Sequence, residues 1–243
     1  MPQRRITDSS KATGLMMKKF ATCIIYGLMS FVAIEAARAD VTPSKDAPAL
    51  KQSVPVVLTG SDADKAIHKA DLFLSSAPTM VGDFVQTGAD GRRSEGKIYV
   101  QKPGKLRFEY AAPAALEVIS DGTSVAVNDR KLKTQQTYAI GQTPLKFLLQ
   151  DKIDLKSDTQ VLNVLNSPEA MMILLDDRTT FGGTSRIRLI FDPVTYELRQ
   201  WQVRDPQGYE TLVTLYNLDL KQKPDPALFK IVPLSTAVDT SKN

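Results

Sequence analysis

Residues 96–110 read GKIYVQKPGKLRFEY, and this stretch decides the fold. Two arms of alternating apolar and polar residues flank Pro103-Gly104, a dipeptide that favours a turn. In the second arm, positions 106, 108 and 110 are apolar, whereas positions 105, 107 and 109 are charged. Because successive side chains of a strand point to opposite faces, the stretch predicts a β-hairpin with one apolar and one solvated face.

The same period of two continues on both sides of this hairpin, and turn-forming pairs such as Asp121-Gly122 separate the segments. This spacing is typical of an antiparallel meander. About eleven strands are expected, near residues 80–87, 95–101, 105–110, 116–120, 124–128, 132–137, 159–165, 171–175, 184–191, 197–204 and 209–220. The sequence therefore predicts one mainly β domain with a few helices.

Two or three short helices are expected, and two of them can be placed. The first spans about 61–76, with Ser61 as its N-cap and one apolar stripe, and Pro78 stops it. His68 falls off that stripe beside lysines and is interpreted as a solvated residue. The second is a short helix at 144–150 with an apolar cluster.

The expected sheet is too large for these helices to cover. Eleven strands at ~4.8 Å spacing would span roughly 50 Å if the sheet were flat. Such a sheet must curl, and two or three short helices cannot fill its concave side. The pattern leaves two interpretations open: an apolar cavity for a lipid-like ligand, or a fully packed sandwich without one.

The N-terminal 39 residues are interpreted as an extension and a secretory signal peptide. Met17-Lys18-Lys19 precedes an apolar run at 20–34, which is shorter than a membrane-spanning helix, and Ala37-Arg38-Ala39 supplies small residues for cleavage. Cleavage is expected between Ala39 and Asp40, which predicts a periplasmic protein. Residues 40–60 are expected to be a flexible lead-in, and 61–243 a single folded domain.

Removing residues 1–39 leaves 25 basic and 25 acidic residues, although the whole chain carries a formal charge of +4. A neutral chain argues against non-specific nucleic-acid binding. Cys23, the single cysteine, lies in the expected leader, and His68 is the single histidine, so neither disulfides nor a usual zinc site is expected.

No constellation for catalysis emerges from the sequence. It contains no Gly-x-Ser-x-Gly elbow, P-loop or His-Glu-x-x-His motif. Asp176-Asp177-Arg178 is interpreted as the polar end of a hairpin rather than an acid/base pair. We therefore expect a protein that is not an enzyme.

The chain resembles the LolA-type outer-membrane lipoprotein carriers from about Ile67 to Pro233. Four blocks carry the resemblance: residues 82–86 (GDFVQ), residues 96–110, the hairpin at 118–125 (VISDGTSV), and a tail with 191–195 (FDPVT), 205–208 (DPQG) and 228–233 (LFKIVP). Their order and spacing are specific to the family when taken together.

The resemblance implies a half-open antiparallel β-barrel, closed by a helical lid over a hydrophobic cavity. It also implies the partners: acylated lipoproteins as cargo, an inner-membrane ABC-type exporter, and an outer-membrane acceptor or the membrane itself. No cofactor is expected, and the protein is expected to act as a monomer.

Particular residues can then be assigned as hypotheses. The wall of the acyl-chain cavity would comprise Phe84, Leu106, Phe108, Tyr110, Val118, Ile187, Leu189, Phe191, Trp201 and Val203. The lid would comprise Ile67, Ala70, Phe73 and Leu74 of the first helix, with Leu145, Leu148 and Leu149 of the second.

Lys102 is the latch candidate, because it stands where the family usually has an arginine that holds the lid shut. An ammonium group lacks the planar fork of a guanidinium, so a lysine latch would be looser. A lysine that simply ends a strand in water is the alternative.

The alternatives to a lipoprotein carrier are a carrier or sensor of the same fold for another lipid or glycolipid, and a purely structural envelope protein with a solid core.

Overall fold

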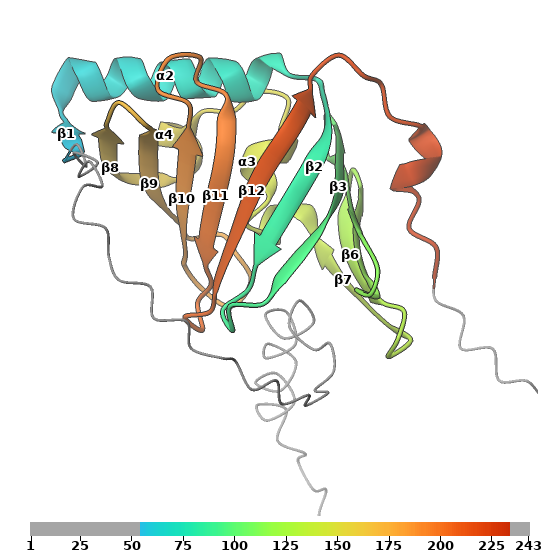
Figure 1. The fold of residues 1–243 in the computed structure, drawn as a ribbon. Helices are drawn as coiled ribbons and strands as arrows, with labels where there is room; N and C mark the ends of the chain where they lie inside the picture. The colour runs from blue at the N-terminus through green and yellow to red at the C-terminus, as the bar shows by residue number, and fades with distance from the viewer. Residues whose placement is uncertain (1–53, 234–243) are drawn as a thin grey trace, which may run out of the picture.

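The computed structural model describes residues 54–233, which form one open antiparallel sheet with a helical cover (Figure 1). The strand order is β1-β8-β9-β10-β11-β12-β2-β3-β4-β5-β6-β7, and β1 and β7 are the two free edges. The strands are β1 (Val56–Leu58), β2 (Thr79–Thr87), β3 (Arg93–Gln101), β4 (Lys105–Tyr110), β5 (Leu116–Asp121), β6 (Ser124–Asp129), β7 (Thr134–Ala139), β8 (Gln160–Asn166), β9 (Met171–Asp177), β10 (Ser185–Phe191), β11 (Leu198–Arg204) and β12 (Glu210–Asp219).

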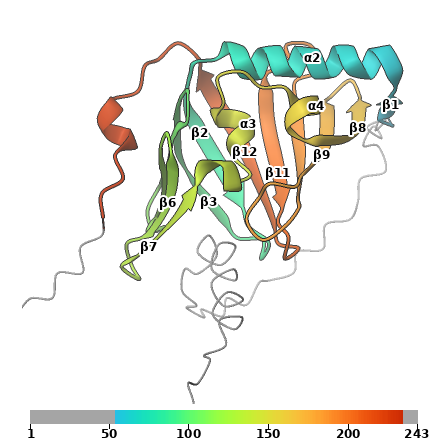
Figure 2. The same ribbon diagram turned by 180° about the vertical axis from the view of Figure 1, so that it is seen from behind.

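Three α-helices and two 3₁₀ turns accompany the sheet. They are α2 (Gly60–Ser76), α3 (Lys146–Leu149), α4 (Leu155–Asp158), η1 (Ile140–Gln142) and η2 (Pro226–Phe229). The helix α2 runs across the ends of the strands, and α3 and α4 lie on the inner side of the curved sheet (Figure 2). The predicted class, a mainly β half-open sheet covered by helices, is confirmed.

The structure differs from the sequence-based prediction at several elements. The sheet has twelve strands rather than eleven, because β1 forms within the expected lead-in and pairs with β8. Three residues are too few to show a period of two. The expected helix at 144–150 shrinks to four residues after η1, and both α4 and η2 were not anticipated. The strand expected at 132 begins at Thr134, because Lys133 adopts a positive φ of 51° in the preceding turn.

Cross-strand register carries the alternation of the sequence into one apolar inner face. Ile98, Phe108 and Val118 form one row across β3, β4 and β5. Ile173, Leu189 and Trp201 form another across β9, β10 and β11. Such rows are the packing unit of an antiparallel sheet, and here they give the core a continuous floor.

A glycine in β3 lets two aromatic rings meet across the sheet. Gly96 lies between Phe84 of β2 and Tyr110 of β4 in the register. A Cβ atom at Gly96 would lie 2.0 Å from the backbone oxygen of Glu109, a distance that real atoms do not tolerate. Only glycine allows the backbones of β3 and β4 to approach this closely while the rings close over them.

The chain after β12 crosses the outer face of β4 to β7. The Arg107 guanidinium donates from Nη1 to the Leu228 backbone oxygen at 3.1 Å, and Gln135 donates from Nε2 to the Val232 oxygen at 2.9 Å. Phe229 of η2 is buried at this crossing. Arg107 also pairs with the buried carboxylate of Glu117. The outer face of this half of the sheet is therefore partly covered.

The expected leader at 1–39 lies outside the described residues, as does the lead-in up to residue 53. Within 54–233, no helix is long and apolar enough to cross a membrane. The proposed division into leader, lead-in and carrier domain therefore stays a prediction.

Candidate functional site

The residues assigned from sequence to the cavity wall lie together on the inner face of the sheet. Nine of the ten are buried and Val203 is partly buried. Further inner-face residues that the sequence analysis did not assign are Met80, Ile98, Val100, Val125, Val127, Val164, Met171, Ile173, Leu175, Leu198, Val213 and Leu215. The face is thus more extensive than predicted. Burial alone fits both a ligand wall and an ordinary core, so the assignment stays a hypothesis.

Aromatic side chains fill the space beneath the lid. The ring centroids of Phe84 and Phe108 are 4.9 Å apart, and those of Phe84 and Tyr110 are 5.0 Å apart, both edge to face. The ring of Trp201 packs between the sheet and the lid. Its centroid is 6.2 Å from that of Phe108 in the sheet and 5.9 Å from that of Phe147 in α3. Edge-to-face packing of this kind adds to the stability given by burial. In this conformation the lid and the sheet form one packed core.

One buried hydrogen bond interrupts the apolar face. The Tyr110 hydroxyl donates to Oε1 of Gln86 at 2.9 Å, and both side chains are buried. Burial raises the pKa of the Tyr110 hydroxyl above its ordinary value, so the group stays protonated as the donor. The sequence analysis treated Tyr110 as apolar and used Gln86 only as the last residue of the block 82–86, so it did not predict that the two side chains pair.

The lid residues assigned from sequence also face this interior. Ile67, Ala70, Leu74, Leu148 and Leu149 are buried, whereas Phe73 and Leu145 are partly buried. Ile153 and Leu155, which follow α3 in the chain, belong to the same core, and the sequence analysis did not anticipate them. His68 is exposed on α2, as expected.

The hairpin that connects β3 and β4 contacts both lid helices. Nζ of Lys102 donates to the backbone oxygen of Leu74 near the end of α2. Two residues further, the Gly104 backbone N–H donates to the oxygen of Leu149, the last residue of α3, at 2.8 Å. Gly104 has a φ of 77°, and a Cβ there would lie 2.6 Å from Gly122. The turn glycine is therefore required both for the positive φ and for the close approach of Gly122.

Lys102 sits in a partly dehydrated position. Loss of water lowers the pKa of its ammonium group to about 8, and the nearby charge of Asp151 opposes this shift. The geometry places Lys102 where a latch would be, but its role stays a prediction.

Hydrogen bonds and an ion pair also join α2 to the segment around α4. The carboxylate of Asp71 accepts from the Leu155 N–H at 3.1 Å, and Ser75 Oγ accepts from the Ile153 N–H at 3.0 Å. Lys156 also pairs with Asp64 at 2.8 Å on the surface. Desolvation raises the pKa of the Asp71 carboxyl, although the bond from Leu155 opposes this shift. Thus α2 and α4 are joined by polar contacts that bypass the sheet.

A buried ion pair anchors the beginning of α3, and the sequence analysis did not anticipate it. Nζ of Lys146 lies 2.9 Å from Oδ1 of Asp177, at the end of β9. The residues at 176–178, expected to form one polar hairpin end, therefore point to opposite faces of the sheet. Asp176 pairs with Arg186 on the outer face, whereas Asp177 is fully buried. Two adjacent carboxylates look alike in sequence, and only the pleat of β9 separates them.

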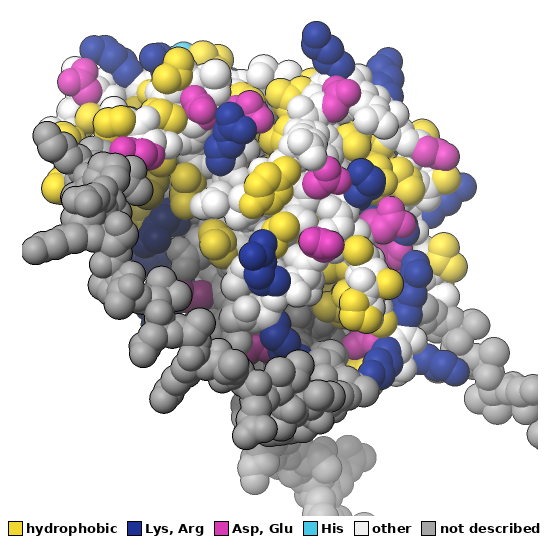
Figure 3. Space-filling view, in the orientation of Figure 1, with side chains coloured by type: hydrophobic (Ala, Val, Ile, Leu, Met, Phe, Trp, Pro, Cys, Tyr) yellow, Lys and Arg dark blue, Asp and Glu magenta, His cyan; other side chains and the backbone are white. Residues whose placement is uncertain are grey.

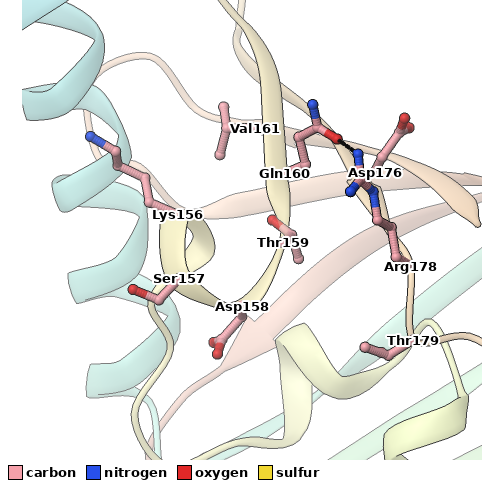
Figure 4. Close-up of a pocket in the computed structure, with 9 residues that line it drawn as sticks. All are labelled: Lys156, Ser157, Asp158, Thr159, Gln160, Val161, Asp176, Arg178 and Thr179. Atoms are coloured by element: carbon pink, nitrogen blue, oxygen red, sulfur yellow. Dashed lines mark hydrogen bonds between the residues drawn. The ribbon is translucent and has the colours of Figure 1, made fainter.

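A polar pocket of about 570 Å³ opens beside this ion pair, between α4 and the ends of β8 and β9 (Figure 4). Arg178 donates to Gln160 across its mouth. The lining residues are Lys156, Ser157, Asp158, Thr159, Gln160, Val161, Asp176, Arg178 and Thr179. This pocket is polar and lies at the rim, so it is distinct from the apolar interior. Across residues 54–233, no cluster of three or more histidine, cysteine or acidic side chains could hold a metal ion.

An open antiparallel sheet whose apolar inner face is closed by hydrogen-bonded helices defines a class of lid-covered β proteins. The sequence profile of the family described as "Outer membrane lipoprotein carrier protein LolA" matches residues 75–232. The chain belongs to that family, as the sequence blocks predicted.

Two sequence relatives agree with this membership. An outer-membrane lipoprotein carrier protein from Methylococcus capsulatus is 27% identical over 170 residues, 66% of this chain and 80% of the relative. One from Dechloromonas aromatica is 27% identical over 180 residues, with 69% and 84% covered. The crystal structure of a LolA superfamily protein from Nitrosomonas europaea matches with a TM-score of 0.41 and 9% identity, over 70% of this chain and 97% of that one.

Proposed function

We propose that this chain is a periplasmic carrier that holds the acyl chains of lipoproteins between its lid and its apolar inner face, and moves them from the inner to the outer membrane. Acyl chains cost about 0.8 kcal/mol per CH₂ group in water, so a lipid anchor needs a shield to cross an aqueous space. The proposed role involves no chemical reaction and no cofactor.

The observation that carries the proposal is a continuous apolar face whose helical cover is attached to the sheet by a small number of polar contacts. The apolar stripe of α2, the short helix α3, and the residues Ile153 and Leu155 lie over that face. The links of α2 and α3 to the hairpin at 102–104 are single hydrogen bonds rather than a sheet ladder. Membership of the lipoprotein-carrier family supports the same cargo.

Loading requires the lid to move, because side chains fill the interior of the closed structure. Phe147 of α3 occupies the space over Trp201, so acyl chains and Phe147 compete for one volume. The lid contacts then reduce the apparent affinity for cargo by the fraction of molecules that are closed. This competition lets the carrier bind an anchor and still release it.

The proposal is tested with the full-length chain expressed with its own leader and purified from a bacterial periplasm. Mixed with membranes that contain the exporter and a tagged triacylated lipoprotein, the protein should release a soluble one-to-one complex detected by native mass spectrometry. The same lipoprotein without its acyl chains is the matched control and should give no complex. Recovery of free lipid alone would refute lipoprotein carriage and favour a carrier of other lipids.

The cellular location has its own test. The amino terminus of the purified protein should begin at Asp40 if the leader is cleaved as proposed. An amino terminus at Met1, Met16 or Met17 on a cytoplasmic protein would contradict a periplasmic role.

A further inference from the structure

We propose that Lys146 and Asp177 form a second latch, which holds α3 over the apolar interior independently of Lys102. The inference rests on the proposed function, since it assigns the pair a part in admitting acyl chains. It concerns two charged residues that meet where α3 begins and β9 ends.

The ammonium group of Lys146 is surrounded by oxygen acceptors from two different segments. Its Nζ donates to Oδ1 of Asp177 and to Oγ1 of Thr179, both at 2.9 Å, and to the backbone oxygen of Asp158 at 3.2 Å. The exposed fraction is 12% for the Lys146 side chain and 0% for that of Asp177. One lysine thus ties α3 to the end of β9, to the loop after it and to the end of α4.

The loop after β9, which contains Thr179 and Phe181, is held in place by hydrogen bonds. Oδ1 of Asp177 accepts from the backbone N–H of Thr179 at 2.9 Å, and the Phe181 N–H donates to the Gln142 oxygen at 2.8 Å. The bond from Thr179 orients the Asp177 carboxylate toward Lys146, and the bond from Phe181 ties the same loop to η1, just before α3.

The pair lies at the opposite end of α3 from the contact with the hairpin. Lys146 is the first residue of α3, and Leu149, which accepts from Gly104, is the last. Phe147 and Leu148 between them are buried in the core. The helix cannot leave the interior until the bonds at both ends have broken, so Lys146 gates the volume that Phe147 occupies.

The charge pair makes the closed state sensitive to the loss of either partner. In the closed state both groups are dehydrated, and each compensates the charge of the other. In the open state water solvates them separately. Removing one partner therefore leaves an uncompensated buried charge in the closed state alone, which shifts the population toward the open state.

The closed state also carries an unsatisfied oxygen at this point. Oδ2 of Asp177 is buried and has no hydrogen-bond partner among the described residues. A buried carboxylate oxygen without a donor is costly, and opening would give it water. The latch is thus strong enough to hold α3 but includes a feature that favours release.

The test uses the single tryptophan of the chain as a reporter, because Trp201 contacts Phe147 of α3. In the full-length periplasmic protein, Lys146→Met should shift Trp201 emission to longer wavelength without ligand, since α3 no longer covers the ring. The same variant should bind a synthetic triacylated cysteine peptide about tenfold more tightly, because less of the protein is closed.

Two further variants separate a latch from a merely structural role. Lys146→Met combined with Asp177→Asn removes both charges while keeping an acceptor for Thr179. It should shift emission and affinity in the same direction as Lys146→Met but less, because the latch bonds are lost while no uncompensated buried charge remains. Arg186→Met, which breaks the exposed pair with Asp176 on the neighbouring outer face, is the matched control and should change neither.

Each outcome decides the question. Unchanged emission and affinity in Lys146→Met, weaker binding by that variant, or a larger shift in the double variant would overturn the latch. If the wild-type protein does not bind the acylated peptide, the proposed function fails, and the ligand-free emission of Lys146→Met still decides whether the pair holds α3.

Discussion

Two lysines hold the two main helices of the lid, and they do so by different chemistry. Lys102 reaches the end of α2 and donates to a neutral backbone carbonyl, that of Leu74. Lys146 starts α3 and pairs with the buried carboxylate of Asp177. The first contact depends on the hydrogen-bonding of one dehydrated ammonium group, whereas the second depends on mutual neutralisation of two buried charges.

The surroundings of the two lysines explain what each contact can do. Dehydration lowers the pKa of Lys102 to about 8, so the closed protein begins to lose this charge near pH 8. Lys146 lies against a buried carboxylate that compensates its charge. The free-energy cost of burying that charge appears only when the partner is removed. We therefore propose that the α2 end of the lid is the adjustable end and that the α3 end opens or closes as a unit.

The largest effect is expected from Asp177→Leu, which leaves Lys146 buried without a compensating charge. Loss of one partner of a buried pair typically lowers the free energy of unfolding by about 3–5 kcal/mol. Urea unfolding followed by Trp201 fluorescence measures this loss. An effect no larger than that of a surface pair would mean that Lys146 finds water in the closed protein.

A smaller effect is expected from Lys102→Met, which removes the bond to the Leu74 carbonyl. The bond that is removed has a net value of about 1 kcal/mol, but relief from ammonium dehydration opposes its loss, so the free energy of unfolding should change by about 1 kcal/mol or less. The same unfolding experiment measures it, and hydrogen exchange near the end of α2 should speed up while that near α3 does not. Equal acceleration at both helices would show that the two ends of the lid are not independent.

The pH dependence of the Lys102 contact sharpens the comparison further. The lowered pKa means that the closed protein binds its lysine proton less tightly than an open or unfolded chain. The cost of the buried charge is complete below about pH 8, and the closed state gains stability as pH rises from about 8 toward the ordinary lysine value of 10.5. Apparent affinity for an acylated peptide should therefore fall over that interval.

Lys102→Arg is the control for this titration, because a guanidinium group stays charged throughout the interval. The variant should show no such change in affinity between pH 8 and pH 10. An identical pH profile in the arginine variant would assign the titration to another group.

The smallest effect is expected from Arg186→Met. The Arg186 side chain is 52% exposed, and its pair with Asp176 lies on the outer face at 2.9 Å. Exposed ion pairs contribute about 1 kcal/mol or less, so thermal unfolding should hardly change. A loss comparable with that of Asp177→Leu would mean that the outer face contributes to the core in a way that its exposure does not suggest.

Sequence patterns located most of the sheet because each strand carries its own evidence. Residues 105–110 became β4 with the bounds expected from the alternation, and the Pro103-Gly104 turn followed from local chemistry. Strand β1 escaped because three residues carry no period, and its pairing with β8 joins segments about 110 positions apart. Helix α4 escaped for the same reason, since four residues make one turn and its stability comes from contacts with α2.

The space-filling view shows a further limit of pattern reading. The outer face carries apolar side chains among its charged ones, although the alternation predicted a solvated face (Figure 3). Val57, Leu165, Met172 and Ile190 form one cross-strand row on that side. Apolar residues on the outer side of long strands weaken the simple assignment of faces from composition.

The sequence by itself determined the class of fold, the family and the apolar inner face, because alternation and turn chemistry are local properties that survive in a linear reading. It also singled out Lys102, through its place beside a turn that the family shares. Only the tertiary structure decided that Lys146 meets Asp177 and that Gly104 meets Leu149. These contacts join residues brought together by the curl of the sheet, and neither member of a pair shows in its own sequence neighbourhood that a partner exists.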